Sequence, residues 1–212
     1  GVSGTGFAAT ITCTPGADGS YLPGNVAPSC NTVSAATITQ PSTAGWYILT
    51  RSRLYEPLVV GNTDVTANVA GGYAGIGNQF SSGAAGVSIN TGTVKFTVTG
   101  NGNINGLGSH SNVDMTTKDV ILGLTDNYSG GNSSGGVAQY GVLAGSTIDS
   151  GELAAYNGKY TTITTDALNI TQTATGGSTN AILNNGIRAI QGANKDSGKG
   201  SAGQVIVNGI LD

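Results

Sequence analysis

Residues 86–106, GVSINTGTVKFTVTGNGNING, carry the clearest two-residue periodicity in this chain. Apolar residues alternate with polar ones over 87–89 and again over 93–99. Between these two runs lies a short loop that contains Gly92. Alternation of this kind is typical of half-buried strands, and a short glycine-containing loop is typical of a β-hairpin. The segment therefore predicts two antiparallel strands that pair with each other.

The rest of the chain repeats this pattern of a short β-branched run followed by a Gly or Asn turn. Five Asn-Gly pairs begin at positions 101, 105, 157, 185 and 208. Strand-like runs recur every 8 to 15 residues, which predicts one all-β domain over 1–212, an antiparallel sandwich or a barrel-like fold. A parallel β-solenoid is the alternative, because such chains also alternate short strands with Gly/Asn corners. No fixed repeat period is visible, which counts against the solenoid.

Three further segments carry specific expectations. Residues 46–49, WYIL, and 118–124, KDVILGL, are strongly apolar and predict well-covered strands. Residues 159–173 predict one strand long enough to bend. At 184–186, Asn-Asn-Gly separates two apolar runs, which favours a hairpin turn over a helix, because two Asn and a Gly are costly inside a helix.

The surface is expected to be polar but weakly charged. The chain has 36 Gly, 27 Thr and 19 Asn against 8 Lys plus Arg, and charged residues make up 9 %. Such a surface suits packing against copies of itself, since few charges need to be desolvated. A net charge of −3 without a basic cluster argues against nucleic acid. No apolar run reaches the length of a membrane span.

Cys13 and Cys30 flank a turn-rich loop with three prolines. No CxxC spacing suggests a metal or redox site, so a disulfide that closes the 13–30 loop is expected. In an exported protein it would contribute about 3 kcal/mol by constraining the unfolded chain. The start at Gly1 without Met is typical of a processed terminus.

No catalytic residue, metal ligand or cofactor site is predicted, so the protein is expected not to be an enzyme. His110 is the single histidine and lies among small polar residues, which indicates a solvated loop rather than a catalytic triad. Glu56 and Glu152 are the only glutamates. A calcium site could be drawn from Asp114, Asp119 and Asp126, but no DxDxDG loop is present, and solvated surface is the preferred interpretation.

Two sugar-related features are visible. Sequons stand at Asn127, Asn132 and Asn169, and two of them fall in a Gly/Ser-rich loop where glycans would be accessible. Eight tyrosines could stack on sugars from a sheet face, although ordinary strand and interface positions explain them equally.

The N-terminal TGFAATITC, the Gly/Thr/Asn-rich body of low charge and the closing QVIVNGIL together resemble subunits of prokaryotic surface filaments. These are pilins and thread-like fibres that polymerise by donating a strand to a neighbour. The resemblance implies a secreted or cell-surface structural subunit whose partners are copies of itself. Residues 1–13 are the expected donor strand, with Phe7, Ala9 and Ile11 on one face, and 204–211 is the alternative donor. The rival function is a secreted adhesin or carbohydrate-binding β-domain that binds host or surface glycans.

Overall fold

A computed structural model describes sixteen strands and the segments around them. The described residues are 9–16, 21, 30–38, 48–50, 57–69, 75–78, 87–100, 104–109, 113–127, 138–145, 160–175, 183–190 and 202–212.

The strands form three sheets. Sheet A contains β1 (Thr32–Val33), β4 (Leu58–Val60), β7 (Val87–Thr91), β10 (Val113–Thr116), β13 (Tyr160–Thr165) and β16 (Ala202–Val207). Sheet B contains β3 (Ile48–Thr50), β6 (Ile76–Asn78), β9 (Ile104–Ser109), β12 (Ala138–Ala144) and β15 (Leu183–Ala189). Sheet C contains β2 (Ala36–Ile38), β5 (Thr63–Val69), β8 (Val94–Gly100), β11 (Val120–Asp126) and β14 (Leu168–Ala174).

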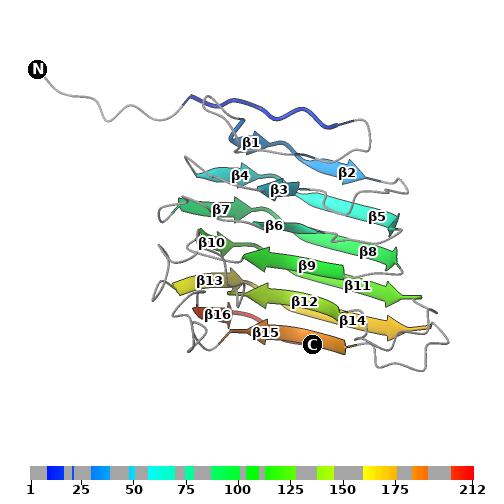
Figure 1. Ribbon diagram of the computed structural model, residues 1–212. Helices are drawn as coiled ribbons and strands as arrows, with labels where there is room; N and C mark the ends of the chain where they lie inside the picture. Colours follow the sequence, from blue (N-terminus) through cyan, green and yellow to red (C-terminus); the bar gives the residue numbers. More distant parts are fainter. Residues whose placement is uncertain are drawn as a thin grey trace, which may run out of the picture.

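The chain passes through sheet A, then sheet C, then sheet B, and repeats this cycle (Figure 1). Every pairing between neighbouring strands is parallel. The fold is therefore a parallel β-solenoid, whose coils stack along one axis. The prediction of an antiparallel sandwich or barrel is wrong, and the solenoid that was the alternative fits the structure.

Unequal coils explain why no repeat period is visible in the sequence. The corner between sheets A and C recurs in each coil, so the separation of equivalent corner residues measures the length of a coil. Asn62 and Thr93, on adjacent coils, are 31 positions apart, whereas Asp119 and Ala167, on a later pair of adjacent coils, are 48 positions apart. The additional residues fall between strands, as in 145–159 between β12 and β13. Insertions there change the period without changing the register of the sheets.

The predicted hairpin in 86–106 is wrong. β7 and β8 are the two expected strands, but they lie in different sheets and are joined by a corner at Gly92 and Thr93. A Cβ at Gly92 would collide with the side-chain oxygen of Asn62 in the preceding coil. Glycine is needed here because neighbouring coils approach closely, which produces the same sequence signal as a tight turn.

Two further expectations are corrected in the same way. The single strand predicted at 159–173 is replaced by two strands, β13 and β14, which a corner at Asp166 and Ala167 directs into sheets A and C. The expected hairpin turn at 184–186 lies inside β15. By contrast, the apolar run 118–124 contains β11 as expected, and of 46–49 only the residues in β3 are described.

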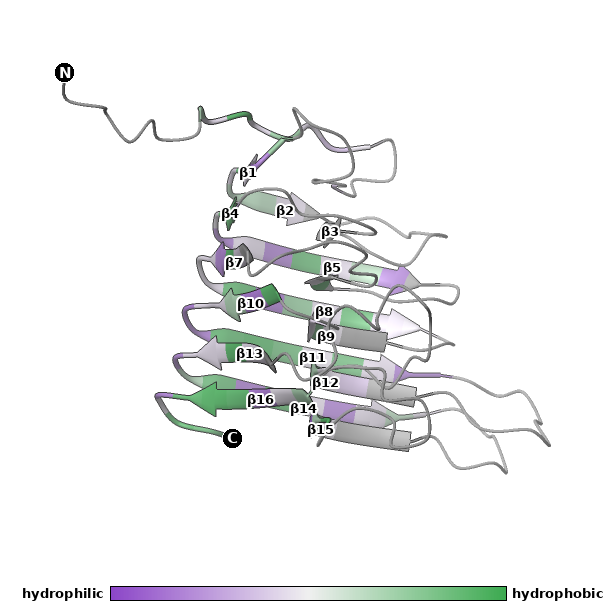
Figure 2. Cartoon of the chain, turned by 60° about the vertical axis from the view of Figure 1, so that its left-hand side comes forward, coloured by the Kyte–Doolittle hydropathy of each residue, from purple (hydrophilic) through white to green (hydrophobic). Residues whose placement is uncertain are grey.

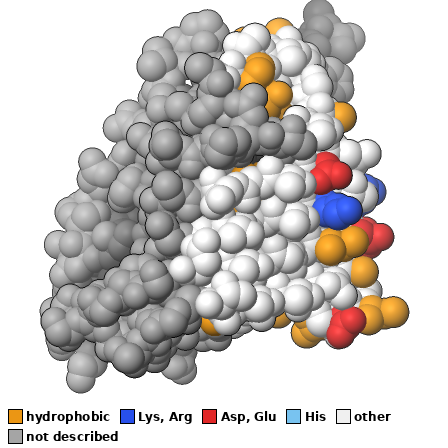
Figure 3. All heavy atoms as spheres, turned by 90° about the vertical axis from the view of Figure 1, so that its right-hand side faces the viewer, with side chains coloured by type: hydrophobic (Ala, Val, Ile, Leu, Met, Phe, Trp, Pro, Cys, Tyr) orange, Lys and Arg blue, Asp and Glu red, His pale blue; other side chains and the backbone are white. Residues whose placement is uncertain are grey.

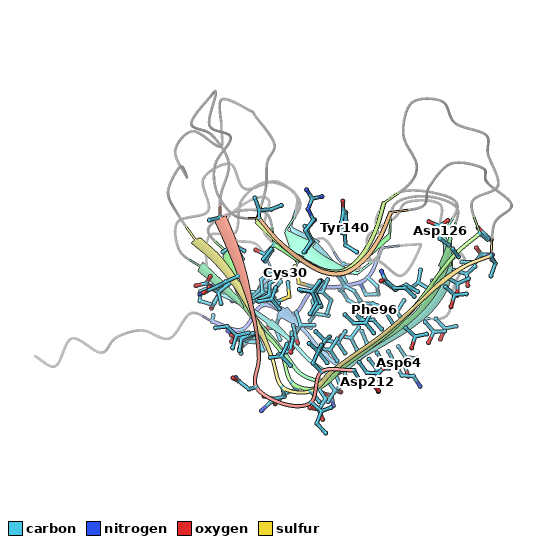
Figure 4. All side chains as sticks on the ribbon, turned by 90° about the horizontal axis from the view of Figure 1, so that it is seen from below. Cys30, Asp64, Phe96, Asp126, Tyr140 and Asp212 are labelled. Carbon is cyan, nitrogen blue, oxygen red and sulfur yellow. A yellow bond between two sulfur atoms is a disulfide. The ribbon has the colours of Figure 1, made fainter. Side chains whose placement is uncertain are left out.

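The core fills the space enclosed by the three sheets (Figure 4). Side chains that point inward form columns along the axis, because parallel register places equivalent residues of successive coils side by side. One column comes from sheet A and another from sheet C, and alternation of hydropathy along the strands is visible in Figure 2. The sheet A column is Leu58, Ile89, Met115 and Ile163, and the sheet C column is Val65, Phe96 and Leu122.

The N-terminal end of sheet A carries one further short pairing. Ile11 accepts hydrogen bonds from the backbone N–H groups of Asn31 and Thr32, and Cys13 N–H donates to the Thr32 carbonyl at 2.7 Å. The Cys13–Cys30 disulfide is confirmed, with the two Cα atoms 4.9 Å apart. It fastens this terminal segment to the first coil.

We expect the native protein to contain no thiol that reacts with an alkylating agent, since its only two cysteines form this disulfide. Mass spectrometry after alkylation should show no added label without reductant and two labels after reduction. Two labels without reductant, in protein made in an oxidising compartment, would contradict the pairing.

Candidate functional site

The outer face of sheet B is concave, and a column of glycines explains its shape (Figure 4). The register places Gly106, Gly141 and Gly186 opposite one another on β9, β12 and β15. A Cβ at Gly106 would lie 2.7 Å from Leu122 Cδ1, and one at Gly141 would lie 2.9 Å from Ile170 Cδ1. Sheet B therefore approaches the side chains of sheet C at this column, and its outer face is hollowed there.

Tyr140 and Arg188 stand on this hollowed surface, which we call the trough. Tyr140 directly precedes Gly141 and points outward in Figure 4. Arg188 Nη1 donates a hydrogen bond of 2.7 Å to the Tyr140 hydroxyl, and its guanidinium carbon lies 5.5 Å from the centre of the tyrosine ring. Leu143, the register partner of Arg188, is half-buried beside them. The trough thus combines a cation, an aromatic ring and an aliphatic side chain.

A second hollow lies on the outer face of sheet C, next to the corner that joins it to sheet A. This corner groove has a volume of about 500 Å³ and is lined by residues that include Asp64, Lys95 and Ile121. Two further lining side chains already bind the backbone. Asn62 Oδ1 accepts from Thr93 N–H at 3.0 Å, and Asp119 Oδ1 accepts from Ala167 N–H at 3.1 Å. These oxygens connect successive coils, which is a structural role rather than a ligand-binding one.

The remaining outer surface of sheet C is polar and mostly uncharged. Outward-facing threonines and one asparagine align along the axis in two columns. In one column, Gly123 takes the position between two threonines. Figure 3 shows the described charged side chains along one edge of the face in view, with mainly uncharged polar surface beside them. The aligned residues are Thr66, Thr97 and Thr171 in one column and Asn68, Thr99, Thr125 and Thr173 in the other.

The lower end of the solenoid is formed by β15, β16 and the C-terminal residues 210–212, which pair with β14, and it carries exposed apolar side chains. Val142 is 0 % exposed inside sheet B, whereas its partner Ile187 on the last strand is 37 % exposed. Ile210 and Leu211 follow β16 at this end and are 78 % and 57 % exposed. We call this surface the open end. In Figure 2 the hydrophobic colouring of β16 and the chain end is visible at the bottom of the stack.

Comparison with protein-family models, with curated proteins and with solved structures found no match. Functional inference therefore rests on the geometry of this chain.

The three aspartates considered for calcium lie on different parts of the solenoid. Asp114 is on the outer face of sheet A, where its Oδ1 accepts from Thr162 N–H at 2.9 Å. Asp119 is at the corner between sheets A and C, and Asp126 is buried at the end of β11. Within the described ranges, no three His, Cys, Asp or Glu side chains gather where a metal ion could be held. In the same part of the chain, no helix is long and apolar enough to cross a membrane.

Several predicted positions lie outside the described residues, namely Phe7, Glu56, His110, Asn132 and Glu152. Of the other sequons, Asn127 is exposed at the end of β11. Asn169 is half-buried on sheet C, and its Nδ2 donates to Asp212 Oδ2 at 3.2 Å. Glycosylation at these sites stays a prediction.

Sequence reasoning did not single out Tyr140 or Arg188, which are 48 positions apart. Tyrosines were considered as sugar-stacking residues only as a class. The two residues meet because parallel register places β15 directly beside β12. The signal that could have found them is the alignment of Asn105-Gly106 with Asn185-Gly186 as equivalent positions in different coils.

Proposed function

We propose that this protein is a non-enzymatic structural subunit of an extracellular filament or surface matrix, in which copies join end to end by β-strand pairing. The observation that carries the proposal is the exposure of inward-facing residues at the open end. Ile187 belongs to a core column whose preceding member, Val142, is fully buried. Removing its apolar surface from water would stabilise a complex that covers this end.

The two ends of the solenoid are complementary in strand direction. At one end of the stack, sheets A and B end with β16 and β15, and residues 210–212 pair with β14 as the last segment of sheet C. At the other end lie β1, β2 and β3, with residues 11–13 paired to β1. Because all pairings are parallel, one copy stacked below another would continue each sheet with the same polarity. Contact between two different surfaces of the same chain does not close on itself unless its rotation forms a ring, so it generates a filament.

The expected donor segment lies at the upper end of this arrangement. Residues 11–13 pair with Asn31 and Thr32 of their own chain and extend sheet A by one short strand. In a stack, β16 of one copy would pair with this strand of the next, and Ile11, which is 38 % exposed, would enter the contact. The assembly role of Phe7, Ala9 and Ile11 stays a prediction, and β16 with Ile210 and Leu211 supplies the opposing surface.

An oxidising compartment agrees with this role, since disulfides such as Cys13–Cys30 form and persist there. A secreted or cell-surface location is part of the proposal. The rival role is carbohydrate binding, and a sugar bound on a lateral face of the solenoid would not compete with assembly along the axis.

Assembly can be tested with one substitution at each end. Leu211→Lys changes the open end, and Ile11→Lys changes the opposite end. Each places a charge in an apolar contact, so we expect a loss of self-association of about tenfold or more. Val59→Lys is the control, because Val59 is 51 % exposed on the lateral surface of sheet A. Sedimentation velocity and negative-stain microscopy measure the assemblies.

Mixing the two end variants tests the head-to-tail arrangement. Each variant keeps one intact end, so an equimolar mixture should form dimers that neither variant forms alone. A wild-type chain that stays monomeric at high concentration would rule out the proposal. Equal loss in the Val59→Lys control, or no dimers in the mixture, would rule out association through these ends.

A further inference from the structure

The corner that follows β16 is longer than the corner of the preceding coil. Between positions that the register pairs across the two coils, the preceding corner contains residues 166–167 and the last corner contains residues 208–210. The last corner begins with Asn208 and Gly209, and both residues are exposed. This corner therefore presents an Asn-Gly pair at the surface of the solenoid.

Packing explains why glycine follows Asn208. A Cβ at Gly209 would lie 2.8 Å from the backbone nitrogen of Ala167 and 3.0 Å from its Cα, both in the preceding coil. These are backbone atoms, which cannot turn aside as the end of a flexible side chain can. Position 209 therefore favours glycine, and because glycine has no side chain, the Gly209 nitrogen is not shielded from the Asn208 side chain beside it.

The reactive groups of this pair are not held by hydrogen bonds. At the corner of the preceding coil, the Ala167 N–H donates to Asp119 Oδ1 at 3.1 Å. Within the described residues, neither the Gly209 N–H nor the side-chain amide of Asn208 has a hydrogen-bond partner. The Asn208 side chain can therefore rotate toward the Gly209 nitrogen without breaking a hydrogen bond.

The two other Asn-Gly pairs in the described ranges are held more firmly. They begin at Asn105 and Asn185 and lie inside β9 and β15. Attack by the following nitrogen requires rotation about the asparagine Cα–C bond, and a strand paired in a ladder permits this only after local opening. Among the described Asn-Gly pairs, the one at Asn208 alone lies outside a strand.

We propose that Asn208 is a site of spontaneous backbone rearrangement. The Gly209 nitrogen loses its proton to solvent and attacks Asn208 Cγ. A bond forms between this nitrogen and Cγ, the bond between Cγ and Nδ2 breaks, and ammonia leaves, which gives a cyclic succinimide. Water then adds to either ring carbonyl and breaks its bond to the ring nitrogen. Opening at one carbonyl gives aspartate, and opening at the other gives isoaspartate, in which the backbone runs through Cγ.

Isoaspartate would lengthen the backbone directly before the terminal segment 210–212. This segment pairs with β14, where Leu168 N–H donates to the Ile210 carbonyl at 2.9 Å and Ile170 N–H donates to the Asp212 carbonyl at 2.8 Å. Ile210 is 78 % exposed, so burial of its side chain contributes little to holding the segment. An additional backbone atom shifts the segment out of register, and both N–H groups of β14 lose their acceptors. The rearrangement takes place within one chain and does not rest on end-to-end assembly.

Incubation of the purified protein in mildly alkaline buffer, followed by peptide mass spectrometry, tests the chemistry. The peptide that contains Asn208 should gain the mass difference between an amide and a carboxyl group. This should happen about tenfold or more faster than at Asn105, which must first be released from its strand. The rate at Asn208 should rise with pH, because the deprotonated nitrogen attacks. Asn208→Gln should remove the change at this site, since the longer side chain closes a ring far more slowly.

Amide hydrogen exchange tests the consequence. Exchange at Leu168 and Ile170 should become faster in the isoaspartyl form, because their acceptors are lost. Freshly prepared Asn208→Asp is the matched control, since it carries the new charge without the additional backbone atom and should keep slow exchange at both amides. Asn208 is exposed, so both variants should fold, which circular dichroism can check.

Three outcomes would overturn the proposal. They are an unmodified Asn208 after incubation, modification of Asn105 at the same rate, and unchanged exchange at Leu168 and Ile170 in the isoaspartyl form. All measurements use dilute protein, so they give the same answer whether or not copies of the chain assemble. Rearrangement in a chain that never self-associates, or assembly of a chain that does not rearrange, separates this inference from the proposed function.

Discussion

Phe96→Ala is expected to lower the free energy of unfolding by about 3–5 kcal/mol. Phe96 is 1 % exposed and points into the interior enclosed by the three sheets (Figure 4). Its register partners Val65 and Leu122 are fully buried on the adjacent coils. Truncation would leave a cavity in the middle of a continuous column, and parallel sheets anchored above and below cannot easily close it. Typical domains are stable by only 5–15 kcal/mol, so the loss is a large fraction of the total.

Thr97→Ala is the matched control, because Thr97 is the next residue on β8 and points outward. Its loss should be below about 1 kcal/mol, since only the β-propensity of an exposed side chain changes. Urea unfolding followed by circular dichroism measures both variants. Similar losses for the two substitutions would mean that the alternation on β8 does not set the inside and the outside of the solenoid.

Period-two patterns identified many of the strands correctly. The alternation over 94–98 gives the buried and exposed sides of β8 without error, and 118–124 contains β11. Alternation reports which face of a strand is buried, and it does so equally for parallel and antiparallel pairing. It does not report which strand is the neighbour. That is why many strand positions were predicted correctly while the predicted sheet topology was wrong.

Glycine was the residue most often misinterpreted. In a hairpin, an Asn-Gly pair supplies backbone conformations with positive φ. In this chain the pairs at 105 and 185 lie inside β9 and β15. At Gly106 a Cβ would lie 2.7 Å from Leu122 Cδ1, so glycine is needed there because sheet B lies close to sheet C, whereas a Cβ at Gly186 would have room. Asn208-Gly209 does form a turn, but it is a corner between two sheets. Local sequence does not distinguish a need for conformational freedom from a need for space.

The trough could not be predicted because it depends on contacts between coils. The Tyr140–Arg188 pair and the glycine column each arise from residues about one coil apart. Unequal coils conceal that spacing, so equivalent positions do not align by a fixed period. The closing QVIVNGIL segment was expected to be a strand, and its first four residues lie in β16. Its role in assembly stays a prediction.

Gly141→Ala should destabilise the protein by about 3 kcal/mol, the upper part of the range for overpacking. A Cβ at Gly141 would lie 2.6 Å from the Gly186 carbonyl oxygen and 2.9 Å from Ile170 Cδ1. The first obstacle is backbone in the adjacent coil, which is fixed by the ladder between β12 and β15. Relief therefore requires the two strands or the two sheets to separate, and this would also flatten the trough around Tyr140.

Gly186→Ala is the matched control, because Gly186 lies opposite Gly141 in the same glycine column. A Cβ there would meet its nearest atom, Ile170 Cδ1, at 3.9 Å, which is an ordinary contact. This substitution should be neutral or stabilise the protein by about 0.4–1 kcal/mol, through the reduced entropy of the unfolded chain. Thermal and urea unfolding of both variants gives the comparison. If Gly141→Ala is tolerated as well as Gly186→Ala, close approach of sheet B to sheet C is not what requires glycine, and the concavity of the trough needs another cause.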